Sequence, residues 1–201
     1  MRVTVIDYKA GNLTSVLKAL QHVGADAVVT DGDLSLVEAA ERIVLPGVGH
    51  FAATERLDAT GLTSAIRTAI ARGVPFLGIC VGMQWLYAGS SEAPYQPGLG
   101  HFNESCARFS EGYEKVPHVG WNSLEIRLNS RLLASVEPGE YVYFTHSYKA
   151  PVTADTAATT YYIEPFASAV ERGNVMGVQF HPEKSGATGL KILSNFLKWE
   201  R

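Results

Sequence analysis

The sequence has few of the features that mark secreted, membrane or nucleic-acid-binding proteins. It contains only two cysteines in 201 residues, Cys80 and Cys106, too few for the disulfide framework of a small secreted protein, so we expect reduced thiols. It has no Lys/Arg-rich block, and its formal net charge of −3 gives no electrostatic reason to expect a nucleic-acid partner. No segment offers the roughly 18 apolar residues of a membrane span, and the opening RVTVID carries no secretion signal. We therefore expect a cytoplasmic protein that binds neither nucleic acid nor membranes.

The composition is that of an ordinary globular protein. Hydrophobic residues make up 46% and charged residues 18%, and a chain of this length can bury one sizeable core, so we expect a single domain over residues 1–201. Histidines and cysteines do not cluster at ligand spacing, so we expect no metal site. The glycine-containing LPGVGHF at 45–51 continues into neither GK[ST] nor a full GxGxxG, and we expect no cofactor.

Strand-like and helix-like segments alternate in the first half of the sequence. The segment 12–24 has apolar residues at helical spacing and ends at a glycine, and a long helical stretch ends near Gly73. Short β-rich runs flank the helical segments at residues 2–7, 26–30, 42–46 and 74–79. Parallel strands need crossover connections, which are usually helices, so this order predicts a parallel sheet with helices on both faces.

The second half has a different pattern. A Pro- and Gly-containing loop at 90–100 is followed by β-type runs, and a hairpin turn is predicted near Gly173. These runs cover residues 118–126, 140–148, 158–163, 168–173 and 174–180, and an amphipathic helix over 189–200 ends the sequence. The predicted class is therefore α/β: a mostly parallel central sheet with helices on both faces and an antiparallel or mixed β section in the C-terminal half.

The stretch GICVGMQ, residues 78–84, places Cys80 between Gly78 and Gly82, at the end of a predicted strand and the start of a predicted helix. A nucleophile on a sharp strand-to-helix turn needs such small neighbours. The N-terminus of the helix would also favour the thiolate, which is the nucleophilic form. Free cysteine is equally at home as a small buried core residue. On this motif alone both interpretations stay open.

His181 is the histidine best placed to serve as a base. GVQFHPE puts it just beyond an apolar strand, with Glu183 two residues later. In an extended backbone these two side chains project to the same side, so Glu183 can orient the imidazole. A local pair that caps the strand end is the alternative. Taken together with Cys80, the pattern favours a catalytic base and its orienting group.

The segment LPGVGHF offers backbone that a ligand can approach closely, and its N–H groups could stabilise an oxyanion. A tight turn without function is the alternative. His50, His118 and His146 lie within or beside these motifs, but the sequence gives none of them a defined role.

Taken in order, the motifs resemble those of the class I, or triad, glutamine amidotransferases. Within that family they resemble the glutaminase subunits of imidazole glycerol phosphate synthases. The motifs are YKAGN (8–12), LPGVGHF (45–51), GICVGMQ (78–84), PHVGWN (117–122), YFTHSY (143–148) and GVQFHPEKS (177–185). Lys9 stands where the family commonly has glycine, and Val81 where it commonly has leucine.

The resemblance implies a cysteine-based hydrolysis of L-glutamine to glutamate and ammonia. Cys80 would form a thioester with the substrate, His181 would move protons, and Glu183 would orient His181. Val81 and the segment of Val48 and Gly49 would supply the oxyanion hole, whose second donor is aimed only in the activated complex. The residues implied to bind the substrate are Gly47, Gln84, Glu92, Ser147 and Tyr148.

The resemblance also implies a partner, a cyclase subunit with a (β/α)8 barrel fold. It would receive the ammonia in a heterodimer and make imidazole glycerol phosphate and the ribonucleotide AICAR in histidine biosynthesis. The implied interface residues are Asn12, Trp121, Tyr143 and Lys184; on composition alone Trp121 and Tyr143 would be core residues. Two alternatives remain: a triad glutaminase of another synthase, for anthranilate, guanylate or pyridoxal phosphate, or a non-catalytic α/β regulatory module. PHVGWN and HPEKS argue against the first, and the complete triad against the second.

Overall fold

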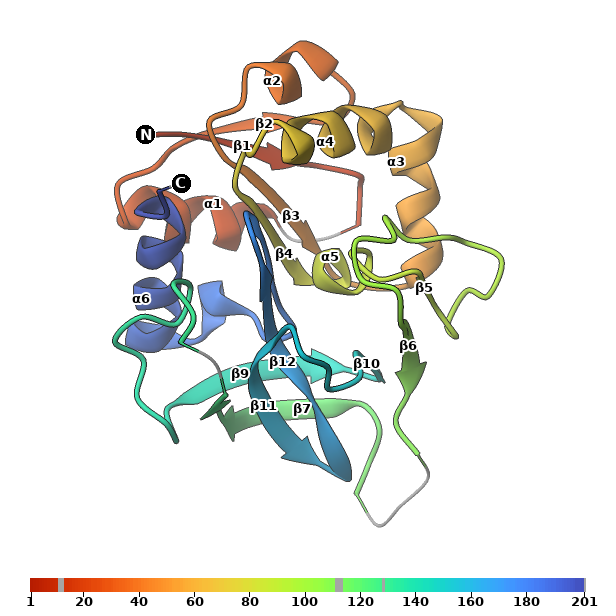
Figure 1. The fold of residues 1–201 in the computed structure, drawn as a ribbon, viewed down its shortest axis with the longest axis vertical. Helices are drawn as coiled ribbons and strands as arrows, with labels where there is room; N and C mark the ends of the chain where they lie inside the picture. The colour runs from red at the N-terminus through yellow and green to blue at the C-terminus, as the bar shows by residue number, and fades with distance from the viewer. Residues whose placement is uncertain (11–12, 111–113, 128, 201) are drawn as a thin grey trace.

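The computed structural model describes residues 1–10, 13–110, 114–127 and 129–200. In this part of the chain an eight-stranded sheet crosses the molecule (Figure 1). Its strands are β1 (Arg2–Ile6), β2 (Asp26–Thr30), β3 (Ile43–Gly47), β4 (Phe76–Cys80), β8 (Glu125–Ile126), β11 (Thr156–Tyr162), β12 (Glu164–Arg172) and β13 (Val175–Val178). They lie in the order β2-β1-β3-β4-β13-β12-β11-β8. Pairing is parallel from β2 to β13 and antiparallel from β13 to β8, which confirms the predicted α/β class.

Helices cover both faces of this sheet. They are α1 (Leu13–His22), α2 (Leu34–Glu38), α3 (Glu55–Ala59), α4 (Leu62–Ala71), α5 (Val81–Gln84) and α6 (Gly186–Leu197), with short 3-10 helices η1 (Phe51–Thr54) and η2 (Pro182–Lys184). In Figure 1, α1 and α6 lie together on one side of the central strands, and α2, α3 and α4 lie on the other. Within the described residues, none of the helices has both the length and the apolar composition needed to cross a lipid bilayer.

Two smaller sheets pack beside the central one. Strands β5 (Gly89–Ser90), β6 (Ser105–Arg108) and β10 (Tyr148–Lys149) form the first, and β7 (His118–Ser123) pairs with β9 (Tyr141–His146) in the second. The β-type run predicted over residues 118–126 is therefore divided between two sheets. Leu124, fully buried, separates β7 from β8 and donates its N–H to the Glu140 carbonyl at 2.9 Å. Burial of this side chain fixes the point where the chain passes from one sheet to the other.

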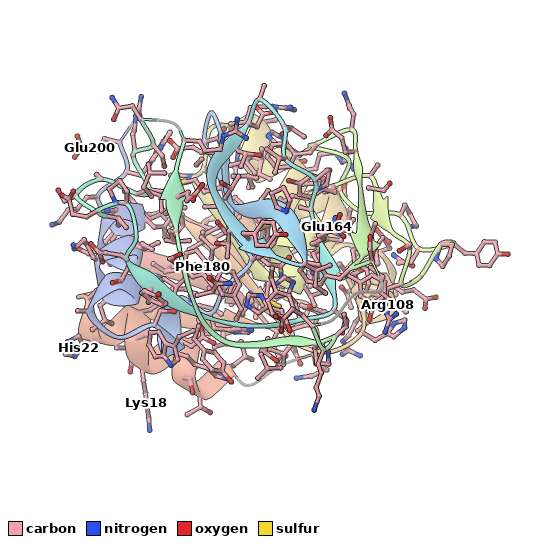
Figure 2. The ribbon with its side chains drawn as sticks, turned by 90° about the horizontal axis from the view of Figure 1, so that it is seen from below. Lys18, His22, Arg108, Glu164, Phe180 and Glu200 are labelled. Carbon is pink, nitrogen blue, oxygen red and sulfur yellow. The ribbon has the colours of Figure 1, made fainter. Side chains whose placement is uncertain are left out.

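The interior follows from the apolar runs of the sequence. Every residue of β3, β4 and β13 is buried, as expected for parallel strands covered on both faces. Phe180, just beyond β13, lies inside the molecule, whereas Lys18, His22, Arg108 and Glu200 lie at its periphery (Figure 2). The hairpin predicted near Gly173 joins β12 to β13, and this glycine has a φ of +60°.

The position of β13 in the sheet creates the site. Although it is the last strand in sequence, it lies between β4 and β12, with Val178 opposite Ile79. On the other side of β4, Gly47 of β3 pairs with Cys80. The segments that follow β3, β4 and β13 therefore leave the sheet at one edge, because the carboxyl ends of parallel strands meet there.

The glycines around Cys80 are required by close backbone contacts. A Cβ atom at Gly82 would overlap the carbonyl oxygen of Leu45 in β3, and one at Gly78 would overlap the backbone of Gly82. The first turn of α5 thus packs directly against β3. Only glycine at position 82 permits the strand-to-helix turn at Cys80 to sit so near the sheet.

We predict that Gly82→Ala lowers the free energy of unfolding by on the order of 3 kcal/mol, because α5 must move away from a buried carbonyl. Gly32→Ala is the matched control: a Cβ at Gly32 would have nothing within 4 Å, and we expect a change within about 0.5 kcal/mol. Denaturant unfolding followed by circular dichroism measures both. Equal stability of the two variants would contradict the proposed contact between α5 and β3.

Candidate active site

Cys80 occupies a strained turn at the end of β4. Its φ of 54° and ψ of −108° lie in a region that residues other than glycine rarely adopt, and such a conformation costs of order 1–3 kcal/mol. The turn lifts the cysteine away from the strand, as a nucleophile elbow requires. The helix that follows is shorter than the dipole argument assumed, since α5 spans four residues. Its dipole therefore contributes less to thiolate stability than a full helix would.

His181 and Glu183 form the pair expected from the sequence. The imidazole Nδ1 lies 2.9 Å from Glu183 Oε1, and both side chains are almost fully buried. The expectation of an extended backbone was wrong, because Glu183 lies in the 3-10 turn of η2. The backbone N–H of His181 donates to the carbonyl of Tyr143 in β9 at 2.9 Å. Backbone and ring are therefore both held in place.

One effect lowers the pKa of His181, and two neighbouring groups raise it. Burial alone would lower the pKa of His181, but the neighbouring Cys80 and the hydrogen bond with Glu183 outweigh this effect and raise that pKa to about 10. Since Nδ1 is engaged by the carboxylate, Nε2 is the ring nitrogen available to the cysteine. An imidazole held between a thiol and a carboxylate can accept the thiol proton and keep it.

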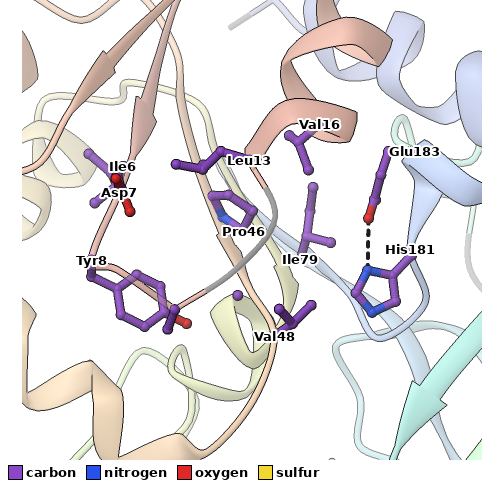
Figure 3. Close-up of a pocket in the computed structure, with 12 residues that line it drawn as sticks. Ile6, Asp7, Tyr8, Leu13, Val16, Pro46, Val48, Ile79, His181 and Glu183 are labelled. Atoms are coloured by element: carbon purple, nitrogen blue, oxygen red, sulfur yellow. Dashed lines mark hydrogen bonds and ion pairs between the residues drawn. The ribbon is translucent and has the colours of Figure 1, made fainter.

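Figure 3 shows His181 and Glu183 at the border of a pocket with largely apolar walls, among them Val16, Val48 and Ile79. The buried hydroxyl of Tyr8 also borders this pocket, and burial, with a smaller effect of Cys80, raises the pKa of Tyr8. Apolar surroundings strengthen the hydrogen bond between imidazole and carboxylate, because little water competes for either group.

The residues that the resemblance assigned to the oxyanion hole differ in where they lie relative to Cys80. Val48 donates its N–H to the carbonyl of Ala10 at 2.9 Å, so this N–H does not point at the cysteine. Gly49, with a φ of +102°, borders the same cleft as Cys80. Val81 is the first residue of α5, where backbone N–H groups have no acceptor within the helix. Its N–H is therefore the donor best placed beside Cys80.

A cleft of about 200 Å³ opens over Cys80. Four of the five residues predicted to bind the substrate border it: Gln84, Glu92, Ser147 and Tyr148. The fifth, Gly47, does not. It borders the pocket of Figure 3 instead, where a Cβ would overlap the hydroxyl of Tyr8. In this structure Gly47 thus serves the packing of Tyr8 behind the site.

Glu92 and Gln84 are each held by the backbone. Glu92 Oε2 accepts the N–H of Phe51 at 2.8 Å, and Gln84 Nε2 donates to the carbonyl of Tyr148 at 3.0 Å. The cleft therefore combines a carboxylate, suited to an ammonium group, with amide and backbone groups suited to a carboxamide. An α-amino acid with an amide side chain matches this set of groups.

Three of the predicted interface residues form one surface cluster. Trp121 is 54% exposed, so it is not a core residue, and its ring lies 6.1 Å from that of Tyr143 at an interplanar angle of 74°. Lys184 Nζ lies 5.7 Å from the centre of the Tyr143 ring. Asn12, the fourth predicted interface residue, lies outside the described residues. The cluster is adjacent to the site because Tyr143 holds the backbone of His181.

His118 and His146 form a buried pair behind the cleft. His118 Nδ1 lies 3.1 Å from His146 Nε2, and His146 Nδ1 lies 2.9 Å from the carbonyl of Tyr148. A carbonyl only accepts, so His146 Nδ1 carries the hydrogen and His146 Nε2 accepts one from His118. Asn122 Nδ2 lies 3.4 Å from His118 Nε2. These contacts fix both rings as neutral tautomers, whereas His50 only caps η1 by accepting the N–H of Ala52.

Gln179 lies near Cys80, and the sequence analysis gives it no role although it falls within the motif GVQFHPEKS. Its side chain is fully buried, and its Nε2 lies 3.6 Å from Cys80 Sγ. The available signal was a lone amide in the apolar run NVMGVQF, because a polar side chain in a buried strand needs a hydrogen-bond partner inside the protein.

The relationship to known proteins agrees with this geometry. Residues 4–199 match the model of the family described as glutamine amidotransferase class-I. The chain belongs to this family. The resemblance noted from the motifs is therefore confirmed, and the edge of the sheet at which Cys80 and His181 meet is the candidate site of a class I glutamine amidotransferase.

Relatives with one shared name cover nearly the whole chain. "Imidazole glycerol phosphate synthase subunit HisH" of Deinococcus radiodurans is 47% identical over 199 residues, covering 96% of this chain and 92% of the relative. The protein of the same name from Synechocystis is 46% identical, covering 98% and 95%, and that from Aquifex aeolicus is 44% identical, covering 98% and 96%.

Solved structures of more distant proteins share the fold. A chain of PurLQS from Thermotoga maritima has a TM-score of 0.73 at 22% identity, covering 98% of this chain and 97% of that one. The glutaminase domain of Trypanosoma brucei CTPS, solved with bound acivicin, has a TM-score of 0.67 at 16% identity, covering 100% and 95%. At these identities the likeness concerns the fold alone.

We predict that His118 and His146 stay neutral well below pH 6, because burial lowers the pKa of His118 to about 4 and that of His146 to about 3. In the unfolded chain both titrate near 6.5. As the pH falls from 6.5 towards 4, the unfolded state therefore binds protons that the folded state does not, and stability falls. Long-range ¹H–¹⁵N spectra at pH 5 should show Nδ1–H tautomers for both rings.

His118→Phe keeps a ring between Tyr162 and Phe144, on which His118 stacks, but removes one titrating group. The gap in unfolding free energy between the protein and this variant should therefore narrow as the pH falls from 7 to 4.5. An imidazolium signal from either histidine at pH 5 in the folded protein would refute the assignment.

Proposed function

We propose that this chain is the glutaminase subunit of an imidazole glycerol phosphate synthase and supplies ammonia for histidine biosynthesis. The observation that carries the proposal is the strained Cys80 beside the His181–Glu183 pair in a member of the class I family. The choice of pathway is supported by the shared name of the relatives, which are 44 to 47% identical over almost the full length. We further propose that residues 1–201 act as one glutaminase domain.

The proposed reaction begins with the cysteine. His181 Nε2 takes the proton of Cys80, and the sulfur attacks the side-chain carbonyl carbon of L-glutamine. The tetrahedral intermediate collapses when the carbon–nitrogen bond breaks and His181 returns a proton to the departing ammonia. A water molecule, deprotonated by His181, then attacks the thioester and releases glutamate and the Cys80 sulfur. Glu183 keeps Nδ1 protonated and stabilises the imidazolium throughout.

The oxyanion of each tetrahedral intermediate is proposed to bind the N–H of Val81 and a second N–H from the Val48–Gly49 segment. The hydrogen bond from Val48 to Ala10 supports a resting state in which the second donor is turned away. Because one oxyanion donor is worth roughly two to three orders of magnitude in rate, we expect weak glutamine hydrolysis by the chain alone and strong hydrolysis in the activated complex.

The partner is proposed to be a cyclase subunit with a (β/α)8 barrel, docked on the cluster of Trp121, Tyr143 and Lys184. An exposed tryptophan beside a tyrosine and a cation is the type of surface that anchors protein interfaces. Its nearness to His181 would let ammonia pass from the thioester step to the barrel without release to solvent. Both cysteines are free thiols, and we propose that the complex works in the cytoplasm.

We predict that Cys80→Ala abolishes glutamine-dependent synthesis by the reconstituted complex and leaves ammonia-dependent synthesis intact, because only the nucleophile is lost. Cys106→Ala is the matched control, since this second buried thiol lies against the carbonyl of Gln84 and has no role in the chemistry. A coupled assay with glutamine or ammonium as nitrogen source measures both activities. Full glutamine-dependent activity of Cys80→Ala would disprove the proposed nucleophile.

We predict that Trp121→Ala weakens binding of the cyclase at least tenfold, about 1.4 kcal/mol, as expected for an aromatic anchor. Tyr95→Ala is the control, because Tyr95 is fully exposed on a loop outside the elements β7, β9 and η2 that carry the cluster, and it should leave the affinity unchanged. Titration calorimetry with the purified cyclase measures both. An equal loss in the two variants, or stable capture of a different synthase component, would overturn the proposed interface.

A further inference from the structure

The amide of Gln179 is in contact with the nucleophile. Gln179 follows β13 directly, its side chain is fully buried, and its Nε2 lies 3.6 Å from Cys80 Sγ. On another side of the sulfur the carbonyl of Thr145 lies 4.0 Å away and can only accept a hydrogen. The sulfur therefore has one neutral donor and one weak acceptor beside it, in addition to His181.

A backbone carbonyl determines which end of the Gln179 amide, oxygen or nitrogen, faces Cys80. The carbonyl of Tyr148 only accepts, so the NH2 group of Gln84 must face it, at 3.0 Å. The same NH2 group lies 3.1 Å from the side-chain oxygen of Gln179. Rotating Gln179 by 180° would oppose two NH2 groups. Its own NH2 group must therefore point at Cys80.

The carbonyl that sets this orientation is itself fixed. It also accepts the Nδ1–H of His146, at 2.9 Å, and His146 is held in that tautomer by His118. The Tyr148 carbonyl thus has two donors on it, and neither Gln84 nor Gln179 can turn without leaving a buried polar group unpaired.

We propose that Gln179 is a further catalytic residue, whose Nε2–H donates to Cys80 Sγ and stabilises the sulfur as thiolate. The inference rests on the proposed role of Cys80 as nucleophile. A donor to an ionised sulfur is a charge-assisted hydrogen bond, about twice as strong as one to a neutral group. The sulfur is negative before attack and again when it leaves the thioester, but not within the thioester. The donor therefore favours formation of the thiolate and its departure during hydrolysis.

The contact is testable in the chain by alkylation of Cys80 with iodoacetamide across a pH series. Cys106→Ala serves as background so that one thiol is followed. In Gln179→Met, which keeps length and removes the donor, the midpoint of the rate profile should rise by about one pH unit, a tenfold loss of thiolate at a given pH. The titratable groups around the sulfur are His181, Tyr8 and, in the same cleft, Glu92 and His146, and all are unchanged in this variant.

Ser168→Ala is the matched control. The buried hydroxyl of Ser168 has no hydrogen-bond partner within the described residues, and its backbone carbonyl, which alanine keeps, accepts the N–H of Gln179 at 2.9 Å. Its alkylation profile should match that of the parent. Gln179→Glu is the second variant: it keeps the shape and the hydrogen bond from Gln84 but places no N–H at the sulfur. It should shift the profile upward by more than Gln179→Met, because its carboxylate also repels the thiolate, and it tests the proposal if the methionine variant does not fold.

Steady-state kinetics of the complex with its cyclase separate this role from a structural one. We expect kcat for glutamine hydrolysis to fall about tenfold in Gln179→Met, with KM changed less than twofold. An unchanged alkylation profile in either folded variant overturns the proposal, as does a rise in KM alone, which would place Gln179 in substrate binding through Gln84. Failure of the proposed function would instead appear as no glutamine hydrolysis by the parent complex, while the alkylation profile still reports on the contact.

Discussion

The parallel pairing of β13 with β4 is the interaction on which the site depends. It brings the end of the chain's last strand beside the strand that carries Cys80, so that the residues following Val178 and Ile79 leave the sheet together. A slip of one residue in this register would turn alternate side chains to the opposite face. Gln179 would then no longer face the sulfur, and His181 would be displaced along the strand. The register is held by burial of every residue in both strands.

Strand β9 connects the surface to this arrangement through its backbone. The carbonyl of Tyr143 holds the N–H of His181, and the carbonyl of Thr145 lies beside the sulfur. The rings of Trp121 and Tyr143 form part of the exposed cluster on the paired strands β7 and β9, while His118 and His146 lie on the buried side. Because side chains alternate along a strand, the same two strands present part of the exposed cluster on one face and the two histidines on the other, where His146 borders the cleft. A shift of β9 would therefore move the two carbonyls that contact His181 and Cys80.

The sequence was sufficient to predict the fold class and the pairing of His181 with Glu183, because both follow from local patterns. The alternation of β-rich runs with helical segments predicts the parallel sheet, and the pair of His181 and Glu183 needs only a separation of two residues. Contacts between residues far apart in the sequence could not be predicted from such local patterns. The direction of the Val48 N–H depends on the carbonyl of Ala10, and the position of Gly47 depends on Tyr8. The exposure of Trp121 depends on which face of β7 is covered, and Gln179 was found only when the contacts of the sulfur were known.

The distribution of charge around Cys80 gives a reason for the many neutral polar groups there. His181 is the one histidine near the sulfur whose pKa is raised, and its cation is balanced by Glu183. Burial lowers the pKa of His146, and repulsion from His118 and His181 lowers it further, so that His146 does not take the proton that the proposed reaction requires on His181. Gln84 and Gln179 carry hydrogen bonds towards the sulfur without carrying charge. A lysine in place of either amide would stabilise the thiolate more strongly, but it would also lower the pKa of His181 by repulsion and weaken the base. Neutral donors avoid this conflict, because they stabilise the ionised sulfur and leave the imidazole able to hold its proton.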